Sequence, residues 1–421
     1  MQNMKKKSLK QNFLWTFVGN SILSLTQFGI LIVLAKVGTP TVVGEYSLAL
    51  AISSPIFIFF NLKLRSAQAT DKNNEYSFSD YYSLRTIANI FAMATIIVIL
   101  FLSDYSLHMS LIILLISVLK LLESKSDIMF GYLQKIERMD LVSISIMLRG
   151  MVSLIFGAII YFIFNSLIIM VTSMIIIRFI ILVFYDLPCI KGLGVNEIKV
   201  KVNNIIAKLF FLTLPLGLSV VLGSLNTNLP RIFLENYSGS YDLGIFAGIS
   251  YLLIAFSTIV NALGQVSTPR LAYYYNKSKP QEFKKLVLKL MFISLALGVT
   301  GIVVVNFAGE LILTILYSKE YAEYNNVFMI IMFGALFLYS SIFIGTALTA
   351  MRRFKVQFPI HLVSFTVILI CSSLFIPRYG IVGAGWVIFA GNVASFISYF
   401  SVYIIITLKN KRGLKNDYKI N

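Results

Sequence analysis

The sequence predicts an all-α membrane protein with about twelve transmembrane helices in two six-helix lobes. The first observation behind this prediction is composition: 58% of the 421 residues are hydrophobic, 13% are charged, and the mean hydropathy is +0.84. A soluble domain carries about 25% charged residues. The second is the grouping of apolar residues into segments of about 20, the length at which a helix crosses a bilayer core of about 30 Å.

The first half of the chain contains six such segments. We expect spans at about 13–36, 44–64, 84–103, 107–122, 141–164 and 166–186. The last two are separated by Asn165 and Ser166, which predict a tight hairpin. The fourth span is short, and the polar stretch 123–140 after it is predicted to be either a helix lying on the membrane surface or a solvated connector.

The second half contains six more segments. We expect spans at about 208–230, 244–265, 286–308, 325–347, 359–376 and 381–408, with an interfacial helix at about 309–324. The equal numbers predict one lobe over 1–200 and another over 201–421. An offset of 200 positions supports an internal repeat, because Gly44 matches Gly244 and Asn61 matches Asn261.

The basic residues predict the orientation. The net charge of +18 could indicate nucleic-acid binding in a soluble protein. With the N-terminus inside, 31 of the 36 Lys and Arg residues fall on the inner side, when those at helix ends are counted with the adjoining loop, and four fall outside. Cytoplasmic loops carry such an excess, so both termini are predicted to be cytoplasmic, with no nucleic-acid partner. Membrane lipids are the expected contact of the basic C-terminal tail.

Two spans of the second half carry polar stripes. Ser224, Asn228 and Arg231 share one helical face, and Asn261 belongs to a similar stripe on the next span. A polar stripe on a spanning helix faces other helices or water rather than lipid. These residues are therefore candidates for substrate binding, and adhesion between helices is the alternative.

Three arginines are the strongest candidates for a binding site. Arg149 and Arg178 lie within spans, and Arg231 lies at the outer end of one. An arginine near the middle of a bilayer costs at least about 2.5–3.5 kcal/mol. Carboxylates are expected only in loops and at helix ends, so an anionic ligand such as phosphate is the natural partner. Hydrogen bonds to backbone carbonyls or contacts with inner-leaflet phosphates are the alternatives.

Catalytic and metal-binding patterns are missing from the sequence. The two cysteines, Cys189 and Cys371, and the two histidines, His108 and His361, are scattered, and no Walker A motif occurs. We therefore expect no catalytic residue, no metal and no cofactor.

Three stretches carry a resemblance to a known family: NTNLPRIFLENYSGSYDLGIFAGISYLLIAFSTIVNALGQVSTPRLAYYY, GEYSLALAISSPIFIFFNLKLRSAQATD and YGIVGAGWVIFAGN. They resemble the polysaccharide repeat-unit flippases, the Wzx-type members of the multidrug/oligosaccharidyl-lipid/polysaccharide superfamily. The resemblance implies two six-helix lobes around a central cavity with cationic residues in it. It also implies outward flipping of an undecaprenyl-diphosphate-linked oligosaccharide across the cytoplasmic membrane of a bacterium, for capsule or surface polysaccharide, with a polysaccharide polymerase and glycosyltransferases as partners.

Three other functions remain open. A multidrug antiporter of the same superfamily needs an intramembrane carboxylate, and none is expected here. A polysaccharide polymerase or glycosyltransferase usually carries a large outer loop, whereas the longest one expected is about 309–324. A flippase for peptidoglycan precursors would share the lipid diphosphate.

Overall fold

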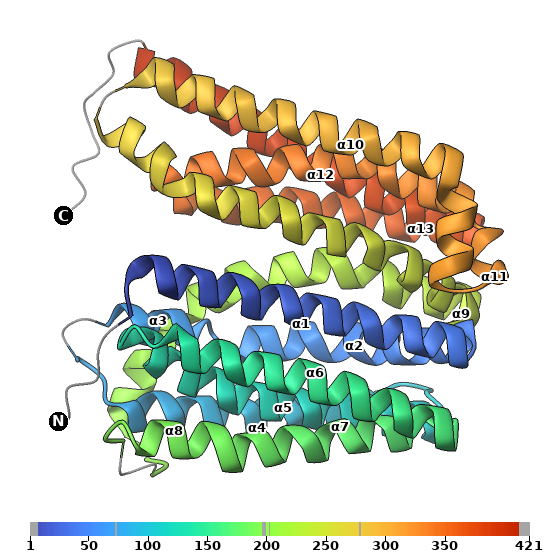
Figure 1. The fold of residues 1–421 in the computed structure, drawn as a ribbon, viewed down its shortest axis with the longest axis horizontal. Coiled ribbons are helices and arrows are strands. Elements are labelled where there is room, and N and C mark those ends of the chain that lie inside the picture. Colours follow the sequence, from blue (N-terminus) through green and yellow to red (C-terminus); the bar gives the residue numbers. More distant parts are fainter. Residues whose placement is uncertain (1–6, 72–73, 196–198, 202, 278, 412–421) are drawn as a thin grey trace. The chain divides into compact units, whose positions relative to one another are not determined.

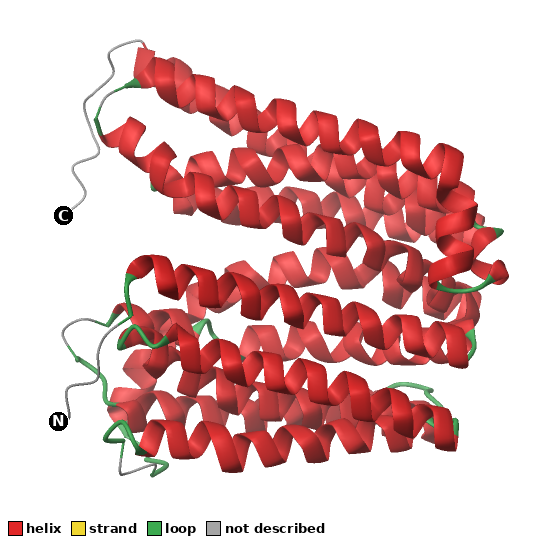
Figure 2. Ribbon diagram, viewed as in Figure 1, coloured by secondary structure: helices red, strands yellow, loops and turns green. Residues whose placement is uncertain are grey.

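The computed structural model describes residues 7–71, 74–195, 199–201, 203–277 and 279–411. Within these ranges the chain forms helices joined by short loops, and Figure 2 shows no strand among them. The described residues form two compact units. The ends of the chain that are predicted to be cytoplasmic, residues 1–6 and 412–421, lie outside the described residues.

The first unit contains Met1–Gly248 and Leu316–Ser318. Its helices are α1 (Leu9–Val37), α2 (Pro40–Phe60), α3 (Leu64–Thr70), α4 (Phe78–Leu102), α5 (Leu107–Lys135), α6 (Met139–Phe164), α7 (Leu167–Ile181), a π-helical turn (Leu182–Asp186), α8 (Leu187–Lys191) and the first part of α9 (Asn204–Asn276). Helix α1 packs along α6, and α6 along α7 (Figure 1). Helix α5 contacts α2, α3, α4 and α7, so it lies at the centre of this group.

The second unit contains Ile249–Ile315 and Lys319–Asn421. It holds the rest of α9, α10 (Pro280–Leu316), α11 (Lys319–Ala322), α12 (Asn325–Ala350), a 3₁₀ turn (Phe354–Val356) and α13 (Gln357–Lys411). Its main packing is α12 along α13 (Figure 1). The lobe boundary expected between residues 200 and 201 stays a prediction.

Ten helices of the described residues are long and apolar enough to cross a membrane. Two of them, in α9 and α13, are 57 and 52 residues long, whereas about 20 residues suffice for one crossing. Each contains a glycine with positive φ, Gly239 at 81° and Gly380 at 53°, which interrupts the helical backbone. Two crossings in each of these helices agree with the predicted total of about twelve. The chain is an all-α, multi-pass membrane protein, as predicted.

Serine and asparagine set several helix ends. The Ser77 hydroxyl accepts a hydrogen bond from the Asp80 amide, and the Asp80 carboxylate accepts one from the Ser77 amide, which forms a capping box at the start of α4. Asn165 ends α6 in the left-handed conformation with φ of 45°, and Ser166 caps α7. The predicted hairpin at Asn165 and Ser166 is therefore confirmed.

Two expected segment boundaries are wrong. Helix α5 continues unbroken to Lys135, so the stretch after residue 122 begins as part of a long helix and not as a separate surface helix or connector. The polar residues after 122 contact polar partners inside the protein, so the helix continues through them. The expected interfacial helix at 309–324 is instead the end of α10 followed by the four-residue α11.

The two glycines related by the offset of 200 meet in the first unit. A Cβ on Gly44 would overlap the backbone oxygen of Ser240, and a Cβ on Gly244 would overlap that of Pro40. The contact is reciprocal, because positions 40 and 44 face positions 240 and 244. It agrees with the internal repeat that the sequence indicates.

Candidate functional site

A pocket of about 280 Å³ within the first unit has six charged side chains in its lining. Below it is called the charged pocket. Its cationic residues are Arg65, Lys120, Arg149 and Arg178, and its anionic residues are Glu123 and Asp127. Gln27, Ser54, Asn61 and Ser124 add polar groups, and apolar side chains complete the lining. The charged side chains of the lining therefore sum to a net charge of +2.

Helix α5 supplies a third of the lining. Lys120, Glu123, Ser124, Asp127 and Phe130 follow one another at spacings of three, one, three and three residues. Residues three and four apart lie on the same face of a helix, so these five residues form one polar stripe with an aromatic ring at its end. The stripe faces α1, α2, α3, α6 and α7, which supply the other lining residues together with Asn61, the residue that caps the end of α2.

Arg149 forms a buried ion pair with Asp186. Nη2 of Arg149 donates to Oδ2 of Asp186, and the hydroxyl of Ser145 lies 2.6 Å from Oδ1. The side chains of Arg149 and Asp186 are 6% and 2% exposed. The expectation that intramembrane arginines lack carboxylate partners is therefore wrong. Asp186 closes a π-helical turn inside the apolar helix Leu167–Lys191 instead of marking the end of a span.

Glu123 is shared by two cations. Nη1 of Arg178 donates to Oε1 of Glu123, and Nζ of Lys120 lies 3.0 Å from Oε2. The Arg178 side chain is buried, whereas those of Lys120 and Glu123 are partly exposed. Glu123 also contradicts the expectation that carboxylates lie only in loops and at helix ends. It is the seventeenth residue of α5, a helix long enough to span the membrane.

Asp127 is shared by two arginines. Nη2 of Arg85 lies 3.0 Å from Oδ2, and Nη1 of Arg65 lies 3.4 Å from Oδ1. Arg85 is fully buried behind the pocket, where it also donates to the side-chain oxygen of Asn61 and lies 3.3 Å from the hydroxyl of Ser124. Asn61, a predicted site residue, thus holds Arg85 in place as well as lining the pocket.

One aromatic ring supports two of the arginines. The guanidinium carbons of Arg149 and Arg65 lie 5.1 and 5.6 Å from the centre of the Phe130 ring. Cation–π attraction at such distances favours both guanidinium groups beside the ring.

The charged pocket includes half of the predicted substrate-binding residues. Arg149, Arg178 and Asn61 line it together. Asn228 and Arg231 are buried on α9 in the same unit and do not line it. Asn261 is exposed in the second unit, where its amide donates to the backbone oxygen of Ser257 at 2.9 Å. The roles of these last three residues stay predictions.

Sequence reasoning missed the other charged residues of the site. Lys120 falls at the end of the predicted span 107–122, and Glu123 and Asp127 fall in the polar stretch predicted to be a surface helix or a connector. Their spacing was the available signal, because residues at i, i+3 and i+7 share a helical face. Arg65 and Arg85 are not among the predicted site residues, because no local pattern in the sequence links them to Asp127.

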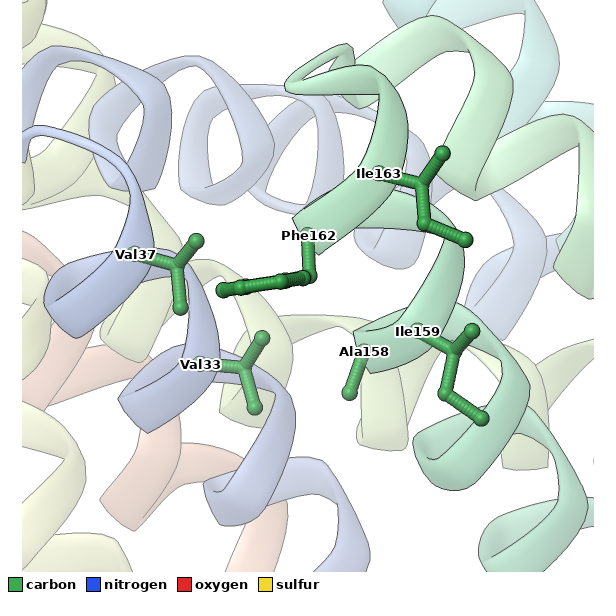
Figure 3. A pocket seen from close by; sticks show the side chains of 6 residues that line it. All are labelled: Val33, Val37, Ala158, Ile159, Phe162 and Ile163. Atoms are coloured by element: carbon green, nitrogen blue, oxygen red, sulfur yellow. The ribbon is translucent and has the colours of Figure 1, made fainter.

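A second hollow is entirely apolar. Its volume is about 430 Å³, and Figure 3 shows the side chains that line it. They come from two packed helices: Val33 and Val37 from α1, and Ala158, Ile159, Phe162 and Ile163 from α6. None of them offers a hydrogen bond or a charge, so this hollow has no means of recognising a polar headgroup.

The sequence and the fold both match known proteins. Residues 9–275 match the model of a family described as polysaccharide biosynthesis protein. The chain is 37% identical over 400 residues to the capsular polysaccharide biosynthesis protein CapF of Staphylococcus aureus. The alignment covers 93% of this chain and 98% of CapF.

Solved structures with a similar fold include transporters. The lipid II flippase MurJ, in an inward closed conformation, has a TM-score of 0.72 and 15% identity, over 97% of this chain and 94% of that one. A multidrug resistance MATE family transporter of the MOP superfamily, in an inward-facing conformation, has a TM-score of 0.67 and 11% identity, over 98% and 97% of the two chains. At these identities the likeness shows a shared fold.

Proposed function

Because this chain belongs to the family of polysaccharide biosynthesis proteins, we propose that it is a flippase for an undecaprenyl-diphosphate-linked oligosaccharide. It moves this lipid across the cytoplasmic membrane of a bacterium, for the synthesis of capsule or another surface polysaccharide. The proposal gains support from the relative that matches 93% of the chain, which is itself a capsular polysaccharide biosynthesis protein.

The observation that carries the proposal is the cationic surplus of the charged pocket. A lipid diphosphate brings about two negative charges into the membrane, and its headgroup needs compensating cations there. Four cations and two carboxylates line the pocket, so a dianion would neutralise it. The excess of cations also argues against a carrier of cationic drugs, even though Glu123 and Asp127 are intramembrane carboxylates of the kind that such an antiporter requires.

The depth of the pocket in the membrane fits this role. Arg149 stands ten residues, about 15 Å, from the start of α6 at Met139, and Glu123 stands about 18 Å from the end of α5 at Lys135. With both termini cytoplasmic, as the basic loops indicate, these helix ends lie at the inner surface and the pocket lies about halfway across. A headgroup there would be in transit between the two leaflets.

The remaining parts of the proposal follow from this role. The protein acts as a transporter and not as an enzyme, and its partners are the lipid-linked oligosaccharide, membrane lipids, and the polymerase and glycosyltransferases that use and make the oligosaccharide. Arg149, Arg178 and Asn61 contribute to substrate binding from the pocket, and Asn228, Arg231 and Asn261 from outside it.

The experiment uses a strain that lacks the gene and carries a plasmid copy. The wild-type chain should restore surface polysaccharide, whereas Arg178→Ala, at equal protein level in the membrane, should restore little and should leave lipid-linked oligosaccharide on the cytoplasmic face. Lys125→Ala is the matched control, because Lys125 stands on α5 near Glu123 and does not line the pocket. Normal surface polysaccharide in the strain without the gene would refute the proposed function.

A further inference from the structure

We propose that the two surplus positive charges of the charged pocket reside on Arg65 and Lys120, and that these two side chains are the direct ligands of a bound diphosphate. The inference rests on the proposed function and assigns the headgroup contacts within the same site. Within the same site, Arg149 and Arg178 contribute to substrate binding indirectly, and like Arg85 they are positioning residues that neutralise carboxylates.

The argument begins with the ion pairs of the pocket. Arg149 and Asp186 form a one-to-one pair that is buried on both sides, so its net charge is zero. The other two carboxylates are each shared by two cations: Asp127 by Arg65 and Arg85, and Glu123 by Lys120 and Arg178. Each of these two groups of three carries one surplus positive charge.

Burial decides which cation of each group is the surplus one. The Arg85 side chain is 0% exposed and is also held by Asn61 and Ser124, and the Arg178 side chain is 8% exposed. A buried arginine cannot leave its carboxylate without leaving its own charge unpaired in a medium of low polarity, whereas a partly exposed cation can turn to a ligand or to water. Arg65 and Lys120 are 27% and 20% exposed and both line the pocket, so a ligand can reach them.

A diphosphate can take over these two cations without leaving any charge unpaired. If Arg65 turns from Asp127 to a phosphate oxygen, Arg85 still neutralises Asp127. If Lys120 turns from Glu123, Arg178 still neutralises Glu123. The two carboxylates stand four residues apart on α5, so their Cβ atoms are about 5–6 Å apart. Their surplus cations are therefore placed for two linked anionic groups, which a single phosphate does not offer.

The two ligands differ in geometry. The planar fork of Arg65 can bind two oxygens of one phosphate, whereas the ammonium of Lys120 acts as a point charge. Phe130 lies beside the Arg65 guanidinium, at 5.6 Å from its carbon to the ring centre. Nε of Arg65 donates to the side-chain oxygen of Gln134 at 3.1 Å, so the two Nη groups are the ones that would turn to the phosphate.

The test measures binding of inorganic diphosphate to the full-length purified protein in nanodiscs of phosphatidylcholine, by calorimetry at constant ionic strength. The wild-type protein should bind diphosphate about tenfold more tightly than inorganic phosphate. Arg65→Gln and Lys120→Gln should each weaken diphosphate binding by about tenfold, because each removes one charge-assisted contact. The double variant should weaken it by about a hundredfold, and Lys125→Gln, which removes a charge from the same helix outside the pocket, should change it by less than about twofold.

The assignment is refuted if the wild-type protein does not bind diphosphate, or if either single Gln variant binds as tightly as the wild type. A second measurement applies if these variants are not monodisperse. Lys120→Cys, in a chain without its two native cysteines, can be treated with a positively or a negatively charged methanethiosulfonate. The positive adduct should restore diphosphate binding and the negative one should abolish it, and equal binding by the two adducts would also refute the assignment.

Flipping of labelled lipid-linked oligosaccharide in sealed vesicles separates this inference from the proposed function. A wild-type protein that binds diphosphate as expected but does not flip the lipid refutes the proposed function and leaves the assignment of Arg65 and Lys120 standing. Flipping that is unaffected by both Gln substitutions refutes the assignment and leaves the proposed function standing.

Discussion

The ion pair between Arg149 and Asp186 allows a quantitative prediction. Arg149→Met replaces the guanidinium with an apolar side chain that fills much of the same space. Asp186, 2% exposed, then keeps the Ser145 hydroxyl at 2.6 Å and loses the cation that pairs with it. The carboxylate is left as a buried charge without compensation.

The expected loss of stability is large when only Arg149 is replaced and small when both members of the pair are replaced. Removing one partner of a buried ion pair costs about 3–5 kcal/mol, whereas replacing both partners by apolar residues is often neutral. We therefore expect Arg149→Met to lower the free energy of unfolding by about 4 kcal/mol, about a thousandfold in the folded-to-unfolded ratio. The double variant Arg149→Met/Asp186→Leu should recover most of that loss.

The assay is unfolding of the purified protein in mixed detergent and SDS micelles, followed by circular dichroism, for the wild type, both single variants and the double variant. Arg65→Met is the comparison, because Asp127 keeps Arg85 at 3.0 Å and is partly exposed. That variant should lose less than about 1 kcal/mol. If the two single losses at Arg149 and Asp186 simply add in the double variant, the two side chains are not coupled and the reasoning is wrong.

Three further predictions concern packing, topology and energy. Gly44→Ala should lower stability by about 1–3 kcal/mol in the same unfolding assay, because its Cβ would overlap the Ser240 backbone. Gly223→Ala, with nothing within 4 Å of the added Cβ, should be neutral or stabilising. Equal stability of the two variants would contradict the close contact at Gly44. In a chain without native cysteines, Lys319→Cys should react with an impermeant thiol reagent in intact cells and Lys277→Cys only after permeabilisation, and the opposite pattern would reverse the topology. Flipping in vesicles should respond to an imposed potential, since moving one charge is worth about 2.3 kcal/mol per 100 mV and the diphosphate carries about two; an unchanged distribution after the potential is reversed would exclude this driving force.

The apolar segments were readable from the sequence because membrane insertion is a local property. About 20 apolar residues in a row satisfy both the bilayer and their own backbone hydrogen bonds as a helix, whatever lies beside them. The same locality explains the hairpin at Asn165 and Ser166, whose conformation depends on those two residues. The ends of the spans are harder to predict, because a polar residue such as Glu123 indicates the end of a span unless its partner is known.

The need of Arg149 and Arg178 for a partner could also be predicted from the sequence, since a charge inside a span requires one wherever it lies. Which carboxylate pairs with each arginine could not be predicted from the sequence. Arg149 and Asp186 are 37 residues apart in the chain, and Arg178 and Glu123 are 55 apart. Only the rotation of each helix about its axis brings the members of each pair together, and that rotation is set by packing against neighbouring helices. The sequence by itself therefore determined that the membrane helices carry cations in need of anions, and the tertiary structure decided which carboxylates neutralise them and which two cations are left in surplus.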